Sequence, residues 1–284
     1  MKGIENYIAK SELDAAPVLA ANITSPFTIE VRFLGGLTQN QMNAFKSAAD
    51  RWSRIIIGDL PSVLVDGELI DDLVIFAQGS NIDGPGGILG QAGPTRLRPA
   101  NAGSAAFLPA MGKMAFDTAD LAKMEQDGTL VDVITHEMGH VLGIGTVWNQ
   151  KNLLKGANTN NPTFVGKAAK KEFGKLRTPP SGPKSVPLEN TGGSGTRDSH
   201  WRETVFHNEL MSGFIAAPNN PISRMTVASL QDIGYVVDMN AAEPFNLPNL
   251  MALAEGGLLM APQSFMNGTI LPNIPLILPE DSLQ

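Results

Sequence analysis

The chain has 284 residues, of which 43% are hydrophobic, so it is long enough to form one large domain or two modest ones around an ordinary core. Its 21 basic and 28 acidic residues give a net charge of -7, which argues against nucleic acid or an anionic membrane surface as the main partner. The lack of cysteine excludes disulfides, cysteine-ligated zinc and thiol catalysis, so any metal must be held by His, Asp or Glu.

The first 25 residues show no hydrophobic periodicity, and we interpret them as a loosely held arm. Their apolar piece is too short for a convincing signal peptide, and no apolar run approaches the ~20 residues of a membrane span. Alternating apolar and polar residues then predict a half-buried strand from Phe27 to Phe33. Thr38 and Gln41 form a capping-box pattern, which starts an amphipathic helix that closes at Gly58.

Two further strands are predicted from the apolar segments Leu73–Ala77 and Lys113–Phe116. The run between them, residues 81–92, is rich in glycine and proline. Such a run turns sharply and exposes carbonyl groups, which together with Asp83 could ligate calcium. A plain surface loop is the favoured interpretation of this run.

The helix that follows carries residues typical of a metal site. A capping-box pattern at Thr129 and Asp132 starts this helix, and Gly143 ends it. His136 and His140 are one turn apart on the same helix face, so both imidazoles can reach one metal ion with Glu137 beside them. This His-Glu-x-x-His pattern on a capped, periodic helix predicts a zinc site in which the glutamate is the general base.

A hydrolytic zinc site takes three protein ligands and keeps one position open for water. Thr146 stands where the short form of the metzincin pattern would place its third histidine, so the third ligand must come from farther along the chain. On residue type alone, six downstream residues remain candidates: His200, His207, Glu172, Glu189, Glu203 and Glu209.

Beyond the helix the composition changes. Residues 149–199 are rich in Asn, Gly, Pro and Lys, which indicates an insertion, with one helix predicted at Thr163–Leu176. A further helix is predicted from the cap Ser223 to Gly234. The tail after Asp238 lacks strong periodicity apart from a short helix predicted at Asn249–Ala261.

Three separated segments resemble the leishmanolysin-like (M8-type) zinc metallopeptidases of the metzincin clan: residues 136–143 (HEMGHVLG), 198–201 (DSHW) and 209–211 (ELM). In that family a long insertion precedes the third zinc histidine, which is commonly followed by Trp, and a Glu-Leu-Met segment supplies the Met-turn. The resemblance spans about 27–238. It implies that His136, His140 and His200 bind one zinc ion, that Glu137 is the catalytic acid/base, and that Met211 is the Met-turn residue.

The resemblance also implies an α+β, metzincin-like fold. Its N-terminal subdomain would hold a twisted mixed sheet with a backing helix and an active-site helix, and its C-terminal subdomain would be largely irregular, with the Met-turn and a C-terminal helix. On this basis the chain divides into an arm (1–25), two catalytic subdomains (26–146 and 147–238, the second with the insertion 149–199) and a tail (239–284). The family resemblance further implies a secreted or extracellular protein.

The predicted function is therefore zinc-dependent endopeptidase activity on a protein or peptide substrate. Such a substrate would bind extended along an exposed sheet edge, for which the candidate strand is formed by Ile88, Leu89, Gly90, Gln91 and Ala92. Two other classes remain open: a gluzincin-type hydrolase with Glu203 as third ligand, and a non-catalytic scaffold or adhesion module stabilised by zinc. Without cysteine, latency through a cysteine switch is impossible.

Overall fold

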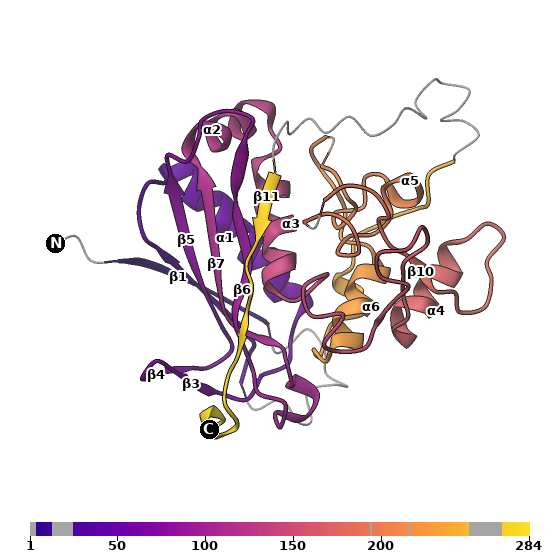
Figure 1. Cartoon of the computed structure of the whole chain (residues 1–284), viewed down its shortest axis with the longest axis horizontal. Coiled ribbons are helices and arrows are strands. Elements are labelled where there is room, and N and C mark those ends of the chain that lie inside the picture. The colour runs from indigo at the N-terminus through magenta and orange to yellow at the C-terminus, as the bar shows by residue number, and fades with distance from the viewer. Residues whose placement is uncertain (1–3, 13–24, 194, 216, 250–268) are drawn as a thin grey trace.

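The computed structural model describes residues 4–12, 25–193, 195–215, 217–249 and 269–284. Figure 1 shows two halves: a sheet backed by helices on one side, and a second half in which helices alternate with irregular loops. The α+β class expected from the sequence is confirmed, because the sheet is mixed and several helices pack against it. None of the described helices is long and apolar enough to cross a membrane.

The main sheet has the strand order β1-β2-β5-β7-β6-β11, and β12 also pairs with β6. The β1–β2 and β6–β7 pairs are antiparallel and the other pairs are parallel. Both predicted inner strands are present, and β2 buries every second side chain as its alternation requires. The strands are β1 (Glu5–Lys10), β2 (Thr28–Phe33), β5 (Leu73–Ser80), β6 (Ile88–Leu97), β7 (Pro109–Asp117), β11 (Thr269–Pro272) and β12 (Leu276–Ile277).

The two ends of the described chain both join this sheet, which the sequence did not reveal. The interpretation of residues 1–25 as a loose arm is wrong for residues 5–10, because β1 pairs along its whole length with β2 and Tyr7 donates a hydrogen bond to Asp50 (2.7 Å). Part of the tail returns as β11 and β12 beside β6. The helix predicted at Asn249–Ala261 lies, apart from Asn249, outside the described residues.

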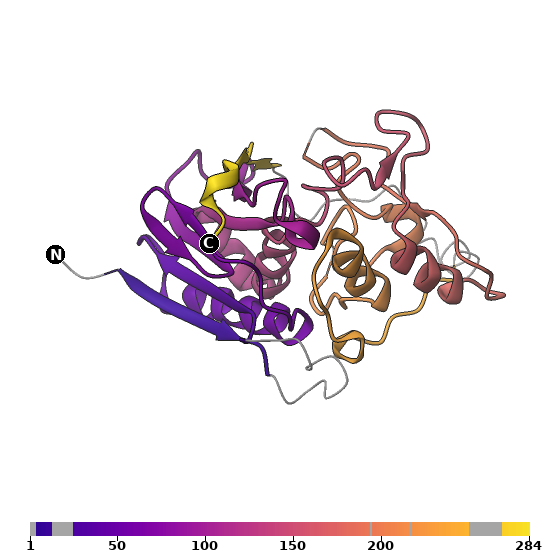
Figure 2. The ribbon, with the colours of Figure 1, turned by 90° about the horizontal axis from the view of Figure 1, so that it is seen from below.

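Three helices cover the sheet: α1 (Gln39–Ile55), α2 (Thr118–Asp127) and α3 (Leu130–Val141). The capping box at Thr38 and Gln41 is confirmed, with both reciprocal hydrogen bonds present. The one predicted at Thr129 is wrong, because α2 ends at the left-handed Gly128 and leaves Thr129 in a helical conformation without a side-chain cap. α1 packs against α3 and against β1 and β2, while α3 contacts β6 and β7 (Figure 2).

The second half is built from α4 (Lys167–Leu176), α5 (Glu203–Phe206) and α6 (Arg224–Ile233), with a small sheet of β8 (Leu154–Lys155), β9 (Thr163–Phe164) and β10 (Val186–Pro187). The helix predicted at Thr163–Leu176 starts late because residues 163–164 pair as β9. Ser223 caps α6 as predicted. A hairpin of β3 (Val63–Val65) and β4 (Glu68–Ile70), and three 3-10 turns at Gly103–Ala105, Met239–Ala241 and Glu280–Ser282, complete the fold.

A continuous core joins the two halves. Trp148, just after α3, stacks on Trp201 with ring centroids 4.9 Å apart, and Phe164 from the insertion packs against both rings. All three side chains are fully buried. The packing of these rings fixes where the segment after residue 199 meets the end of α3.

Candidate metal centre

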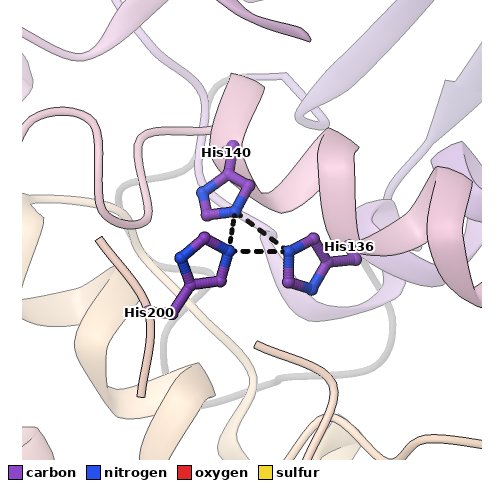
Figure 3. Close-up of side chains that lie close together, drawn as sticks. All are labelled: His136, His140 and His200. Carbon is purple, nitrogen blue, oxygen red and sulfur yellow. Dashed lines mark hydrogen bonds between the residues drawn. The ribbon is translucent and has the colours of Figure 1, made fainter. Parts of the chain in front are cut away.

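Three imidazole rings meet at the border between the two halves (Figure 3). His136 and His140 project from α3, and His200 comes from the loop that precedes Trp201. Their Nε2 atoms lie 3.1 Å (His136–His140), 3.0 Å (His136–His200) and 2.9 Å (His140–His200) apart. The helix spacing thus places two rings on one face, and the fold adds a third from sixty residues away.

The other ring nitrogen of each histidine faces a backbone carbonyl. His136 Nδ1 lies 2.6 Å from the oxygen of Leu210, and His140 Nδ1 lies 2.8 Å from that of Ile144. His200 Nδ1 lies 2.9 Å from the oxygen of Thr196. A carbonyl can only accept, so each Nδ1 carries the proton and each Nε2 presents a lone pair. Three lone pairs that converge within about 3 Å repel one another unless a cation lies between them.

Burial keeps the three rings neutral, which is the form that binds a metal. All three histidines are at most 7% exposed. Desolvation lowers the pKa of His136 to about 3 and that of His140 to about 4. Desolvation, followed by the proximity of His140 and His136, lowers the pKa of His200 well below its usual value. The rings therefore need not lose protons before a metal binds at neutral pH.

The donor set fits zinc. Zn–N bonds of about 2.0–2.1 Å at tetrahedral angles place ligand nitrogens about 3.3–3.4 Å from one another, a few tenths of an ångström wider than observed here. Three neutral imidazoles with backbone-bonded Nδ1 atoms leave one tetrahedral position unfilled. Among the described residues the only other such cluster is Asp59, Asp71 and Asp72, which is acidic and remote from these rings in sequence.

Glu137 lies in the same cavity as the histidines. The cavity has a volume of about 270 Å³ and is lined by all four of these side chains and by residues of β6 and β11. Oε1 of Glu137 lies 3.9 Å from His136 Nε2, and the residue is 7% exposed. Desolvation raises the pKa of Glu137 to about 8, so its carboxyl group is well matched to taking up and releasing a proton near neutrality.

Met211 lies directly beneath this helix. It is fully buried, and a β-carbon placed on Gly139 would come within 2.7 Å of its sulfur and 3.0 Å of the Trp52 ring. A larger residue at position 139 would therefore displace the Met211 side chain. Sequence reasoning treated this glycine as an unspecified position, yet the methionine packs against it.

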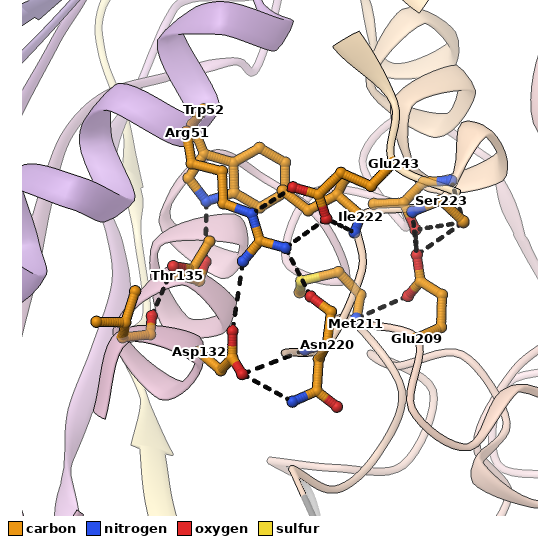
Figure 4. Close-up of polar contacts among 12 residues, drawn as sticks. Arg51, Trp52, Asp132, Thr135, Glu209, Met211, Asn220, Ile222, Ser223 and Glu243 are labelled. Atoms are coloured by element: carbon orange, nitrogen blue, oxygen red, sulfur yellow. Dashed lines mark hydrogen bonds and ion pairs between the residues drawn. The ribbon is translucent and has the colours of Figure 1, made fainter. Parts of the chain in front are cut away.

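The peptide unit between Leu210 and Met211 links a buried carboxylate to a histidine. Its carbonyl oxygen faces His136 Nδ1, and its N–H donates to Oε2 of Glu209 (2.7 Å; Figure 4). Because a peptide unit is planar, holding its N–H end also orients its carbonyl end. Oε1 of Glu209 accepts from the N–H and the hydroxyl of Ser223 and from the hydroxyl of Thr226. Glu209, itself fully buried, thus anchors the turn on which His136 rests.

A second set of polar contacts joins α1, α3 and the far half (Figure 4). The Arg51 guanidinium on α1 pairs with Asp132 at the start of α3 (3.4 Å) and with Glu243 beyond α6 (2.8 Å). Asp132 also accepts from the side chain of Asn220 (3.0 Å). These contacts fix the N-terminal end of α3 against the segments before and after α6.

Backbone contacts place His200. Gly145 has a φ of +76°, and a β-carbon there would come within 2.1 Å of the carbonyl oxygen of Ser199, so the turn after α3 lies directly on the residue before His200. The carbonyl of His200 accepts from the N–H of Glu189 (2.9 Å), and the N–H of Trp201 donates to the carbonyl of Met211 (2.9 Å). The third histidine is thereby aligned with the segment around Met211.

The other candidate ligands lie elsewhere. The Glu189 carboxylate accepts from the N–H groups of Asn190 and Thr191, and Glu172 pairs with Lys175 (2.6 Å). Glu203 accepts from the N–H of Phe214, and His207 leaves Nε2 buried without a hydrogen-bond partner. None of these residues, nor Glu209, joins the histidine cluster, so the gluzincin alternative with Glu203 lacks the geometry it requires.

The calcium hypothesis at Asp83 finds no support. Both oxygens of that carboxylate accept from the N–H of Ile88 (3.1 and 3.0 Å), and Asp83 belongs to no cluster of metal-binding side chains among the described residues. Asp117 and Asp120 accept from further N–H groups of the same loop. The loop thus turns its N–H groups, rather than carbonyls, toward the carboxylates.

The candidate substrate strand Ile88–Ala92 is present as the first half of β6, but its edge is not exposed. β7 pairs with one side of β6, and β11 pairs with the other in a parallel register that runs from Thr269 opposite Ile88 to Pro272 opposite Ala92. The sequence could not show this, since strand pairing across such a separation leaves no local signal.

Comparison with known proteins agrees with this site. The sequence model of the leishmanolysin peptidases (family M8) matches residues 72–253, more than half of the chain. The chain belongs to the leishmanolysin family. A leishmanolysin homolog from Crithidia fasciculata is 28% identical over 139 residues, 45% of this chain and 20% of that protein. Leishmanolysin from Leishmania tropica is 30% identical over 148 residues, 48% of this chain and 21% of that protein.

A third relative has higher sequence identity over a shorter match. A leishmanolysin-like peptidase from Caenorhabditis elegans is 45% identical over 49 residues, which are 17% of this chain and 7% of that protein. The matched part of the chain spans about a fifth of the two longer leishmanolysins and less of the nematode protein. The leishmanolysin family is zinc-dependent, and the cluster of three buried histidines in this member could bind that metal.

Proposed function

We propose that this leishmanolysin-family chain is a zinc endopeptidase with His136, His140 and His200 as the metal ligands. The observation that carries the proposal is the convergence of three buried Nε2 lone pairs within 3.1 Å of one another, beside a buried carboxyl group in a cavity. Each ring is already held in the tautomer that a ligand needs. Met211 and Glu209 support the ring of His136 from below.

The cavity residues have distinct roles in peptide hydrolysis. Zinc bound there supplies Lewis acidity, which polarises the scissile carbonyl and acidifies the attacking water. Glu137 takes up the proton of that water and then delivers it to the nitrogen of the leaving amine, for which its raised pKa suits it. The apolar walls that bury Glu137 also limit competing solvent.

The two halves of the fold have separate tasks in this proposal. Residues 26–146 provide the inner strands of the sheet, two histidines and the general base. Residues 147–238 provide the third histidine and the Met-turn. An extended peptide substrate would bind in the cavity between them, beside the edge of β6 that β11 covers. A protein that cleaves other proteins in this way fits the secreted or extracellular location that the family resemblance implied.

Glu137→Gln tests the proposal. The amide has nearly the same shape but cannot take up the proton, so we expect about one zinc per chain to remain, while casein cleavage falls by roughly 10²–10⁴-fold. Glu125→Gln, a like change at a half-buried residue of α2 that does not line the cavity, is the matched control and should keep full activity. Metal analysis and a digest of a proteome-derived peptide library read both outcomes. Retained cleavage by Glu137→Gln would sink the assignment.

The same measurements address the scaffold alternative. A chain that holds zinc only for stability would show metal-dependent melting and no cleavage of any peptide in the library. A buried carboxyl group beside the three rings is not needed for structural zinc, and burying it without a charged partner is unfavourable. Its presence favours the catalytic interpretation.

A further inference from the structure

The segment Thr269–Pro275 lies in the cleft where the proposed function needs a peptide. β11 pairs with β6 over Thr269–Pro272, in the place of an added strand (Figure 1). The N–H of Thr269 donates to the carbonyl of Gly87 (2.9 Å), and the N–H of Asn273 donates to that of Ala92 (3.3 Å). The Asn273 side chain adds hydrogen bonds to the carbonyls of Gly93 (2.9 Å) and Lys113 (3.3 Å).

This segment extends across the cleft to the loop that carries His200. A β-carbon on Gly195 would lie 3.0 Å from the carbonyl oxygen of Ile270 and 3.8 Å from the Pro272 ring. Neighbouring strands need about 4.7–4.9 Å between them, so no further strand fits between β11 and that loop. Ile270 and Pro272 also line the cavity that contains the three histidines and Glu137.

The segment is held mainly by its backbone. Three of the four side chains of β11 are exposed, and only Ile270 is partly buried against the core. The next apolar residues remain in solvent: Ile274 is 91% exposed and Leu276 is 61% exposed. Since so little apolar surface is buried, removing the segment loses far less than removing an inner strand such as β5 would.

Another peptide can replace this segment without breaking an ion pair. Residues 269–279 (TILPNIPLILP) include no charged side chain, and Pro272 and Pro275 lack the N–H groups with which a further strand could pair. Because the segment is held mainly by its backbone, an extended peptide that makes the same main-chain hydrogen bonds can take its place.

We propose that residues 269–275 are a resident ligand of the β6 edge, which an extended peptide substrate must displace. This inference rests on the proposed function only in calling the displacing peptide a substrate. Binding of a peptide at this site does not depend on catalysis. The resident segment competes with peptides within the same chain. The apparent KM is therefore the intrinsic KM divided by the fraction of time for which the cleft is open, and kcat is unchanged.

Asn273→Ala tests the proposal in the full chain. It removes both side-chain hydrogen bonds of Asn273 and should open the cleft roughly tenfold more often. Leu271→Ala is the matched control, because that side chain is 42% exposed on the same strand and lines no part of the cavity. Ile270→Ser, which weakens the one partly buried contact, provides a second variant should Asn273→Ala fail to fold.

The decisive readout is binding rather than cleavage. A fluorescent peptide with the sequence of residues 269–277 is titrated by anisotropy into chains that carry Glu137→Gln, so that it cannot be cut. We expect it to bind the Asn273→Ala chain about tenfold more tightly than its parent, and the Leu271→Ala chain like the parent. Equal affinity in Asn273→Ala, or in Ile270→Ser where that variant replaces it, overturns the proposal.

Activity then separates this inference from the proposed function. In chains with Glu137 intact, Asn273→Ala should lower KM about tenfold at constant kcat. If no chain cleaves any peptide while the anisotropy difference is found, the peptidase assignment fails and the peptide-binding site stands. A lowered kcat with unchanged KM contradicts displacement.

Discussion

The link from Glu209 to His136 yields the sharpest prediction. In Glu209→Gln the retained oxygen can keep its partners Ser223 and Thr226, which leaves the amide –NH2 facing the N–H of Met211. One charge-assisted hydrogen bond of 2.7 Å is then lost and two donors confront each other. The unsatisfied N–H is fully buried, so the free energy of unfolding of the variant should be lower by about 1–3 kcal/mol.

Glu209→Gln should also weaken zinc binding. Once its N–H end is released, the planar Leu210–Met211 unit can rotate, and its carbonyl no longer holds His136 Nδ1 at 2.6 Å. Loss of such a supporting contact typically weakens metal binding by about 10–100-fold. A competition titration with a chromophoric chelator measures the zinc dissociation constant. The Nδ1 proton resonance of His136, recorded in the metal-free protein, should shift upfield as its hydrogen bond lengthens.

Ser223→Ala is the control for this experiment. It removes a hydrogen bond from the other oxygen of Glu209 and the N-cap of α6, at a cost of about 1–2 kcal/mol, but leaves the Met211 N–H in place. We expect comparable destabilisation with the zinc affinity and the His136 resonance unchanged. If Glu209→Gln and Ser223→Ala affect zinc equally, the orienting role of the peptide unit is refuted.

Three further predictions follow from the contacts around the site and the sheet. Gly145→Ala should lower the free energy of unfolding by about 2–4 kcal/mol and weaken zinc binding, because the new β-carbon meets the Ser199 carbonyl. The control is Gly128→Ala, where φ is similar but nothing lies within 4 Å of a β-carbon. This control should cost only about 1 kcal/mol. Removal of zinc by a chelator should lower Tm, and restoring free zinc to 100 times its dissociation constant should return about 2.7 kcal/mol of stability; a Tm independent of zinc would contradict the site. Burial raises the pKa of Asp72 from 3.8 to about 6, so its folded form holds the proton more tightly and stability should fall by about 3 kcal/mol as pH rises from 4 through 6. Urea titrations of wild type and Asp72→Asn should show this slope only in the wild type.

Local patterns revealed much of the fold and two of the three rings. The alternation in β2, the capping box at Thr38 and the cap at Ser223 are each confirmed, because they depend on residues within one element. His136 and His140 could be paired for the same reason, since helix periodicity alone places them on one face. The capping box predicted at Thr129 is wrong because an N-cap residue also needs an extended backbone, which the short connection after Gly128 does not allow.

Features that depend on distant partners could not be read in this way. Residue type left six candidates for the third ligand, and only the family resemblance singled out His200, which the structure places with the other two rings. β11 pairs with a strand 180 residues earlier, and its sequence reads locally as an irregular, proline-containing tail. Glu209 was considered as a ligand on the basis of its charge, whereas its burial among four donors makes it a structural anchor.

The three carbonyls that orient the histidines explain how this site holds a third ring that lies 60 residues after the second. They belong to Ile144, Thr196 and Leu210, all in turns, and each turn is held by a contact of its own rather than by a regular element. Backbone hydrogen bonds on the far side of the site join Glu189 to His200, Trp201 to Met211 and Arg202 to Pro187. Changes of length within residues 149–186 need not disturb these bonds, provided that Phe164 keeps its packing on the Trp148–Trp201 stack. The geometry of the centre thus depends on a few short-range contacts around each ring.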